Sequence, residues 1–126
     1  MKYVRFQGLT PVLGTSSKQG IFQLAYHLKH SPDTCHYHDK ELRRNLTWLE
    51  THLDTPKILD EAKHYRAICW FKDSAFEPLN RIWVLKYLLE ECGYWVDRIK
   101  TSNPGLIVYQ DGWQVAAKPF RSGIRR

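Results

Sequence analysis

The chain has 126 residues, 43% of them hydrophobic and 25% charged, so it is long enough and apolar enough to bury one core. This composition excludes a disordered chain, and no stretch approaches the roughly 18 apolar residues of a membrane span. The opening residues MKYVRFQG lack the apolar run of a secretory signal, and the three cysteines are widely spaced. We therefore expect a cytoplasmic protein that forms a single domain over residues 1–126.

The formal net charge of +6 is concentrated at the two ends of the sequence. Residues 1–30 contain four basic and no acidic side chains, and residues 101–126 contain four basic and one acidic. A field of this sign attracts polyanions such as nucleic acid or an acidic protein surface, although the same charge would also serve solubility alone. The basic tail, residues 119–126, either adds to such a surface or is disordered.

The first half of the chain predicts one strand and two helices. Residues 2–7 alternate polar with apolar side chains, which is typical of a half-buried strand. Ser16 with Gln19 matches a capping box, so a helix should begin near Ser17 and bury Ile21, Leu24, Ala25 and Leu28. Asp39 is expected to cap a second helix, which carries a stripe made of Leu42, Leu46, Leu49 and Leu53.

The second half predicts a central strand, a long helix and a hairpin. Residues 65–71 contain five consecutive apolar positions, from Ala67 to Phe71, which indicates a strand in the middle of the sheet that is covered on both sides. The helix should run from Asp73 or Ser74 to Cys92, with Pro78 in its first turn, Trp83 in its core face and Gly93 as its left-handed stop.

Residues 94–100 then resemble another strand, so residues 65–100 predict a parallel strand-helix-strand unit with a right-handed crossover. Asp111 and Gly112 favour a type I′ turn in a hairpin over residues 106–118. The expected fold is α+β, with a mixed sheet of about five strands and about three helices.

A histidine-rich segment, HLKHSPDTCHYHDKE, raises the question of a metal site. Structural zinc sites bring ligands in close pairs separated by a dozen or more residues, and this spacing does not match. We predict no metal and no cofactor. The one arrangement that remains conceivable is a cluster of His27, His30, His36 and His38.

An anion-binding crevice is the second candidate. The segment GTSSK precedes a predicted helix, and KDS follows the predicted central strand. If the first strand runs parallel to the central one, both segments line the same crevice, with Thr15, Ser16, Ser17, Lys18, Lys72, Asp73 and Ser74. None of these serines has the sharp turn that presents a nucleophile, so the pattern favours a protein that is not an enzyme.

These observations lead to three hypotheses for function. The first is a non-enzymatic binding module for nucleic acid or an acidic protein, whose cations are Lys2, Arg5, Lys18, Lys118, Arg121, Arg125 and Arg126. The second is a small enzyme or ligand-binding domain that uses the crevice. The third is a protein interaction module, an inhibitor or regulator, that offers the edge of the hairpin. The sequence leaves the partner and the oligomeric state open.

Overall fold

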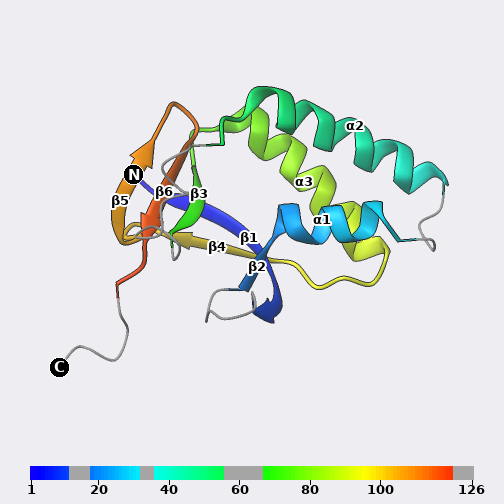
Figure 1. Ribbon diagram of the computed structural model, residues 1–126, viewed down its shortest axis with the longest axis horizontal. Coiled ribbons are helices and arrows are strands. Elements are labelled where there is room, and N and C mark those ends of the chain that lie inside the picture. The colour runs from blue at the N-terminus through cyan, green and yellow to red at the C-terminus, as the bar shows by residue number, and fades with distance from the viewer. Residues whose placement is uncertain (12–17, 32–35, 56–66, 121–126) are drawn as a thin grey trace. The chain divides into compact units, whose positions relative to one another are not determined.

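The computed structural model describes residues 1–11, 18–31, 36–55 and 67–120, which form three helices and six strands (Figure 1). In chain order the elements are β1 (Tyr3–Pro11), β2 (Lys18–Gly20), α1 (Ile21–Lys29), α2 (His36–His52), β3 (Ile68–Lys72), α3 (Phe76–Glu91), β4 (Asp97–Thr101), β5 (Leu106–Gln110) and β6 (Gln114–Lys118). The predicted α+β class is confirmed. None of the described helices is long and apolar enough to span a membrane.

The elements belong to two compact units. Unit 1 comprises Met1–Arg5, Thr55–Ala75 and Lys100–Arg126; unit 2 comprises Phe6–Asp54 and Phe76–Ile99. The chain passes between the units four times, so no single cut in the sequence separates them. The expectation of one domain over residues 1–126 stays a prediction.

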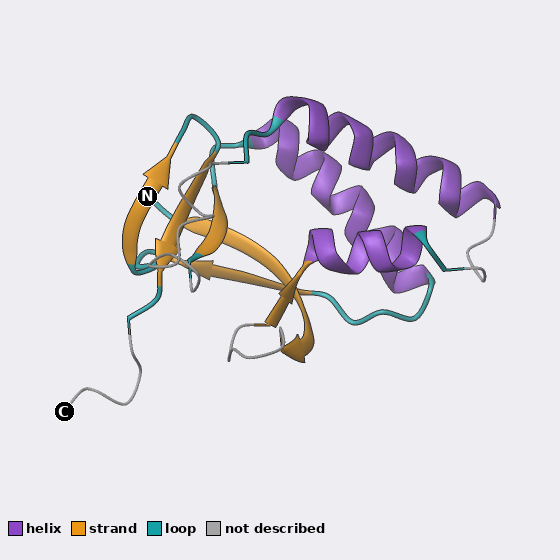
Figure 2. Ribbon diagram, viewed as in Figure 1, coloured by secondary structure: helices purple, strands orange, loops and turns teal. Residues whose placement is uncertain are grey.

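Unit 1 is built from strands (Figure 2). Residues of β1 pair with β3, β3 pairs with β6, and β6 pairs with β5. Strand β3 is interior to the order β2-β1-β3-β6-β5, as predicted, but only Phe71 in it is buried and Cys69 is exposed. The prediction that this strand is covered on both faces is therefore wrong. Strand β6 has that character, since its residues Gln114 to Ala117 are all buried.

The predicted parallel unit over residues 65–100 is also wrong, because the sheet is antiparallel throughout. Strand β3 has β1 and β6 as its neighbours, and β4 pairs with β1 instead of β3. Tyr3 lies opposite Lys72, so the beginning of β1 occupies the place beside β3 that the prediction gave to β4. The sheet is antiparallel instead of mixed and has six strands instead of about five.

The hairpin over residues 106–118 is confirmed, with a different turn. Gly112 does not have the positive φ that a type I′ turn requires. Asp111 organises the turn instead. Its N–H donates to the Gln114 carbonyl at 2.9 Å, and its Oδ1 accepts from the N–H groups of Trp113 and Gln114, each at 2.9 Å.

In unit 2, α1 buries the predicted face of Ile21, Leu24, Ala25 and Leu28 but begins later than expected. Lys18–Gly20 form β2, and the Gly20 N–H donates to Gln23 Oε1 at 3.0 Å at the start of the helix. The Gln23 side chain therefore supplies half of a capping box at Gly20, which has no side chain to supply the other half, and the predicted box at Ser16 and Gln19 does not begin the helix.

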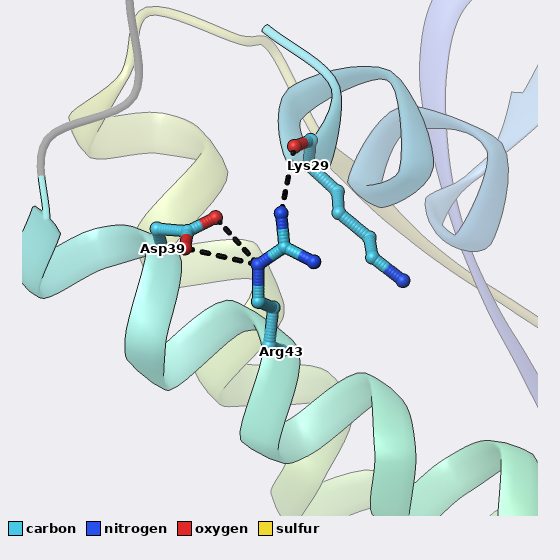
Figure 3. A network of polar contacts seen from close by, with 3 residues as sticks. All are labelled: Lys29, Asp39 and Arg43. Carbon is cyan, nitrogen blue, oxygen red and sulfur yellow. Dashed lines mark hydrogen bonds and ion pairs between the residues drawn. The ribbon is translucent and has the colours of Figure 1, made fainter. Parts of the chain in front are cut away.

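Helix α2 buries Leu42, Leu46 and Leu49, as the leucine stripe predicts, but it begins at His36. Asp39 therefore lies in the first turn, where it binds Arg43 (Figure 3). Arg43 Nε donates to both carboxylate oxygens at 2.9 Å, and Arg43 Nη2 donates to the Lys29 carbonyl at 3.5 Å. Lys29 is the last residue of α1, so α2 places a cation at the negative end of α1.

Helix α3 ends as predicted. Gly93 has φ +90°, its N–H donates to the Glu90 carbonyl at 3.1 Å, and the Tyr94 N–H donates to the Leu89 carbonyl at 2.9 Å. This is the Schellman arrangement, which supplies partners to carbonyls that the helix itself leaves open. Pro78 lies in the first turn, where its missing N–H does no harm.

Candidate functional site

The structure distributes the predicted polyanion-binding residues over both units. Lys2, Arg5 and Lys118 belong to unit 1 and Lys18 to unit 2. Arg121, Arg125 and Arg126 lie outside the described residues.

Arg5 and Lys18 already have hydrogen-bond acceptors. Arg5 Nη1 donates to the Cys69 carbonyl at 3.3 Å, and burial of the guanidinium lowers the pKa of Arg5, partly offset by attraction to the Cys69 side chain. Lys18 Nζ donates to the Leu9 carbonyl at 3.0 Å. Both side chains stabilise the fold locally, so neither is a fully available contact for a polyanion.

Four lysines in unit 1 differ from these two cations. Among the described residues, no carboxylate pairs with the ammonium groups of Lys2, Lys72, Lys100 and Lys118. Lys2 and Lys100 are exposed, and the other two are half-buried. Lys72 and Lys2 belong to the same end of the β1–β3 pair, where the Asp73 N–H donates to the Lys2 carbonyl at 3.1 Å.

The cations of unit 2 are, in contrast, engaged. Three form ion pairs within a helix: Arg43 with Asp39, Arg44 with Glu41, and Lys86 with Glu90. Three lie over aromatic rings, within 5.0–5.8 Å of the centroid: Lys29 over Tyr26, Arg81 over Trp48, and Arg98 over Trp83. Lys18 donates a hydrogen bond to the Leu9 carbonyl. Lys40 is therefore the one described cation of unit 2 that has no ion pair, ring contact or hydrogen bond.

The two units also differ in net charge. The sequence ranges of unit 1 contain eleven Lys and Arg against four Asp and Glu, a net charge of +7. Those of unit 2 contain eight basic against nine acidic residues, a net charge of −1. The excess charge of the whole chain therefore belongs to unit 1, and the described part of that unit also holds the lysines without carboxylate partners.

On the sequence alone, Lys72 is placed in the anion crevice instead of the polyanion-binding set, and Lys100 is not singled out. The sequence carries one signal for Lys100, because it lies two residues after Arg98 in the predicted strand over residues 94–100, and side chains at that spacing share one face of a strand.

The structure contradicts the strand direction on which the crevice hypothesis depends. It required β1 and β3 to run parallel, and they are antiparallel, with Tyr3 opposite Lys72. The segment KDS therefore lies beside the beginning of β1, whereas GTSSK follows its end. Thr15, Ser16 and Ser17 lie outside the described residues, Lys18 belongs to unit 2, and Lys72, Asp73 and Ser74 belong to unit 1.

The histidine cluster gains no support from the described residues. His27 and His30 are exposed at the end of α1, His38 lies in the first turn of α2, and the side chain of His36 is not described. In the part of the chain that the structure describes, no group of three or more His, Cys, Asp and Glu could hold a metal ion. The absence of a metal and of a cofactor stays a prediction.

Comparison with models of known families, with curated proteins and with solved structures finds no match for this chain.

Proposed function

We propose that the chain is a non-enzymatic binding module that uses unit 1 to bind a polyanion, with a nucleic-acid phosphate backbone as the first candidate. The observation that carries this proposal is the contrast between the units. Four lysines of unit 1 have no carboxylate partner among the described residues, whereas the cations of unit 2 are almost all engaged.

An unpaired ammonium group is the kind of cation that a phosphate can take up at little cost. A lysine that already binds a carboxylate must break that pair before it contacts a phosphate. An unpaired lysine exchanges only water and counterions, and the release of counterions from the nucleic acid drives binding. Lysine is a flexible point charge without a fixed hydrogen-bonding fork, so such contacts give affinity with little sequence preference.

The test is a comparison of two variants that carry the same net charge. In the first, Lys2, Lys72, Lys100 and Lys118 of unit 1 are all changed to Gln. In the second, Lys29, Lys40, Arg44 and Lys86 of unit 2 are all changed to Gln. Binding of fluorescently labelled random-sequence single-stranded DNA and RNA is measured by fluorescence polarisation, and circular dichroism verifies that both variants are folded.

We expect the unit 1 variant to bind at least about tenfold more weakly than the wild type, and the unit 2 variant to bind almost as well as the wild type. Equal losses in the two variants would mean that only the total charge matters, and the proposal would be wrong. A wild type that binds polyglutamate but neither nucleic acid would redirect the proposal to an acidic protein partner.

A further inference from the structure

Helix α3 has a second apolar face that lies opposite its core face. Ile82, Leu85, Leu88 and Leu89 are buried on one side. On the other side Phe76, Trp83 and Tyr87 remain 72%, 47% and 58% exposed. The prediction that Trp83 belongs to the core is therefore wrong, because periodicity identifies an apolar face without showing which of two such faces is covered.

These aromatic residues and Asn80 form a stripe along the helix. Phe76, Asn80, Trp83 and Tyr87 are separated by four, three and four residues, which is the alternation of a coiled-coil seam. We call these four residues the α3 stripe. Phe76 and Tyr87 lie at the two ends of the stripe, and Asn80 and Trp83 lie at its two central positions.

Trp83 is held in place by its neighbours in unit 2. Its ring meets the Phe6 ring edge-on, with centroids 5.2 Å apart and an interplanar angle of 81°. Lys86 Nζ and the Arg98 guanidinium lie 5.7 and 5.8 Å from its centroid. A large side chain that is already ordered loses little conformational entropy when a partner covers it.

We propose that the α3 stripe is a dimerisation surface on which α3 of a second copy lies antiparallel. In this arrangement Phe76 lies opposite Tyr87 of the second copy, and Asn80 lies opposite Trp83 of the second copy. Twofold symmetry forms each of these two contacts twice, so one stripe supplies both sides of a closed interface.

The polar groups of the stripe favour the antiparallel direction. Among the described residues, neither the Trp83 indole N–H nor the Asn80 amide has a hydrogen-bond partner. The antiparallel arrangement sets the indole donor beside the amide acceptor. A parallel pair would place Trp83 against Trp83, which joins two indole donors that have no acceptor between them.

The charges beside the stripe favour a protein surface over nucleic acid as its occupant. Glu77, Glu90 and Glu91 lie on the same helix, and unit 2 has a net charge of −1. The exposed area also suits a weak dimer. Aromatic side chains have roughly 150–250 Å² of surface each, and Phe76, Trp83 and Tyr87 are 72%, 47% and 58% exposed. Two copies would therefore bury roughly 700 Å² of aromatic surface, which is the size of a weak, transient interface.

The test is sedimentation velocity on the whole chain at concentrations from about 5 to about 500 µM, a range that brackets a weak protein–protein dimer. Three variants are measured beside the wild type: Phe76→Glu, Tyr87→Lys, and the double variant that combines them. The control is Leu9→Glu, because Leu9 is a 58% exposed apolar residue of unit 2 that lies on β1 instead of α3.

We expect the wild type and Leu9→Glu to dimerise with a dissociation constant of roughly 10–100 µM. Each single variant should be monomeric, because it buries a charge at both ends of the interface. The double variant should associate more strongly than either single variant and less strongly than the wild type, because antiparallel pairing sets each new Glu beside a new Lys while two aromatic side chains per copy are lost.

Three results would overturn the proposal: a wild type that stays monomeric over the whole range, a Phe76→Glu variant that dimerises like the wild type, or a double variant that associates no more strongly than the two single variants. The readout needs no nucleic acid, so its failure is distinct from a failure of the proposed function.

Discussion

Gly105 offers a sharp test of the hairpin geometry in unit 1. Its φ is +120°, and a Cβ at this position would lie 2.1 Å from the Lys118 carbonyl oxygen and 2.9 Å from Pro119 Cα. Both of these atoms are backbone, so no flexible side chain can move aside. The neighbouring residue Leu106 pairs with Lys118, which means that a methyl group would force the end of the hairpin open.

The change Gly105→Ala should lower the free energy of unfolding by roughly 3 kcal/mol. A backbone conformation that only glycine adopts easily costs on the order of 1–3 kcal/mol in another residue, and each lost hydrogen bond adds about 1 kcal/mol. Native domains are stable by about 5–15 kcal/mol, so this is a large fraction. For a chain of 126 residues it corresponds to a fall in Tm of roughly 10 °C.

The matched control is Gly112→Ala in the turn of the same hairpin. Gly112 has no positive φ, and a Cβ there meets nothing within 4 Å, so its free energy of unfolding should change by less than about 0.5 kcal/mol. Urea titration and thermal denaturation, each followed by circular dichroism, measure both variants. Equal stability of the two alanine variants would refute the close approach of Gly105 to Lys118.

Three further changes have expected outcomes. Gly93→Ala should lower the free energy of unfolding by about 1–2 kcal/mol through backbone strain alone, because φ is +90° and no atom crowds the site. Arg43→Ala should cost about 0.5 kcal/mol at low salt, because it removes an exposed ion pair and a contact with the Lys29 carbonyl. Asp111→Asn should destabilise at neutral pH. Burial opposes ionisation of Asp111, but hydrogen bonds from the Tyr109 hydroxyl and two backbone N–H groups outweigh it and lower the pKa of the carboxyl below 3.8.

The pH dependence of the Asp111 change has a definite sign. A depressed pKa in the folded state stabilises the wild type at every pH above the unfolded value, and this advantage disappears as the pH falls through the folded value. Urea titrations at neutral pH and near pH 3 should therefore show a gap between wild type and Asp111→Asn that narrows in acid. A gap that widens in acid would contradict the hydrogen bonding at the turn. A fully stable Gly93→Ala, or an Arg43→Ala loss that is unchanged in high salt, would contradict the other two expectations.

Local patterns in the sequence predict the helices well. The buried faces of α1 and α2 follow from the spacing of Leu24, Leu28, Leu42 and Leu46, because neighbours at three and four residues share a helix face whatever the tertiary structure. The stop at Gly93 is equally local. Helix starts are less certain, as the start of α1 shows, because more than one residue can satisfy the first N–H groups.

The neighbours of each strand could not be obtained in this way. Pairing of Tyr3 with Lys72 joins residues far apart in the sequence, and no local pattern shows that β1 lies beside β3. The turn at Asp111 illustrates a second limit. Asp-Gly favours positive φ, but a carboxylate that accepts two backbone N–H groups stabilises a different conformation.

The candidate site could be predicted in part. Lys2 and Lys118 follow from the charge at the chain ends, whereas Lys72 and Lys100 lie in the interior of the sequence. One physical rule would have found them. A helical cation can pair with a carboxylate three or four residues away, as Arg43 does with Asp39, whereas the side chains of a strand have no partner at that spacing.

The most direct measurement of the central claim is the salt dependence of nucleic-acid binding by the wild type and by the variant in which Lys2, Lys72, Lys100 and Lys118 are changed to Gln. Affinity for single-stranded DNA is measured between about 50 mM and about 200 mM salt, where each phosphate contact adds about 0.7 to the slope of log K against log salt. If unit 1 binds the phosphate backbone through these lysines, the slope of the variant should be smaller by about 3. An unchanged slope, or no binding by the wild type even at low salt, would contradict the account.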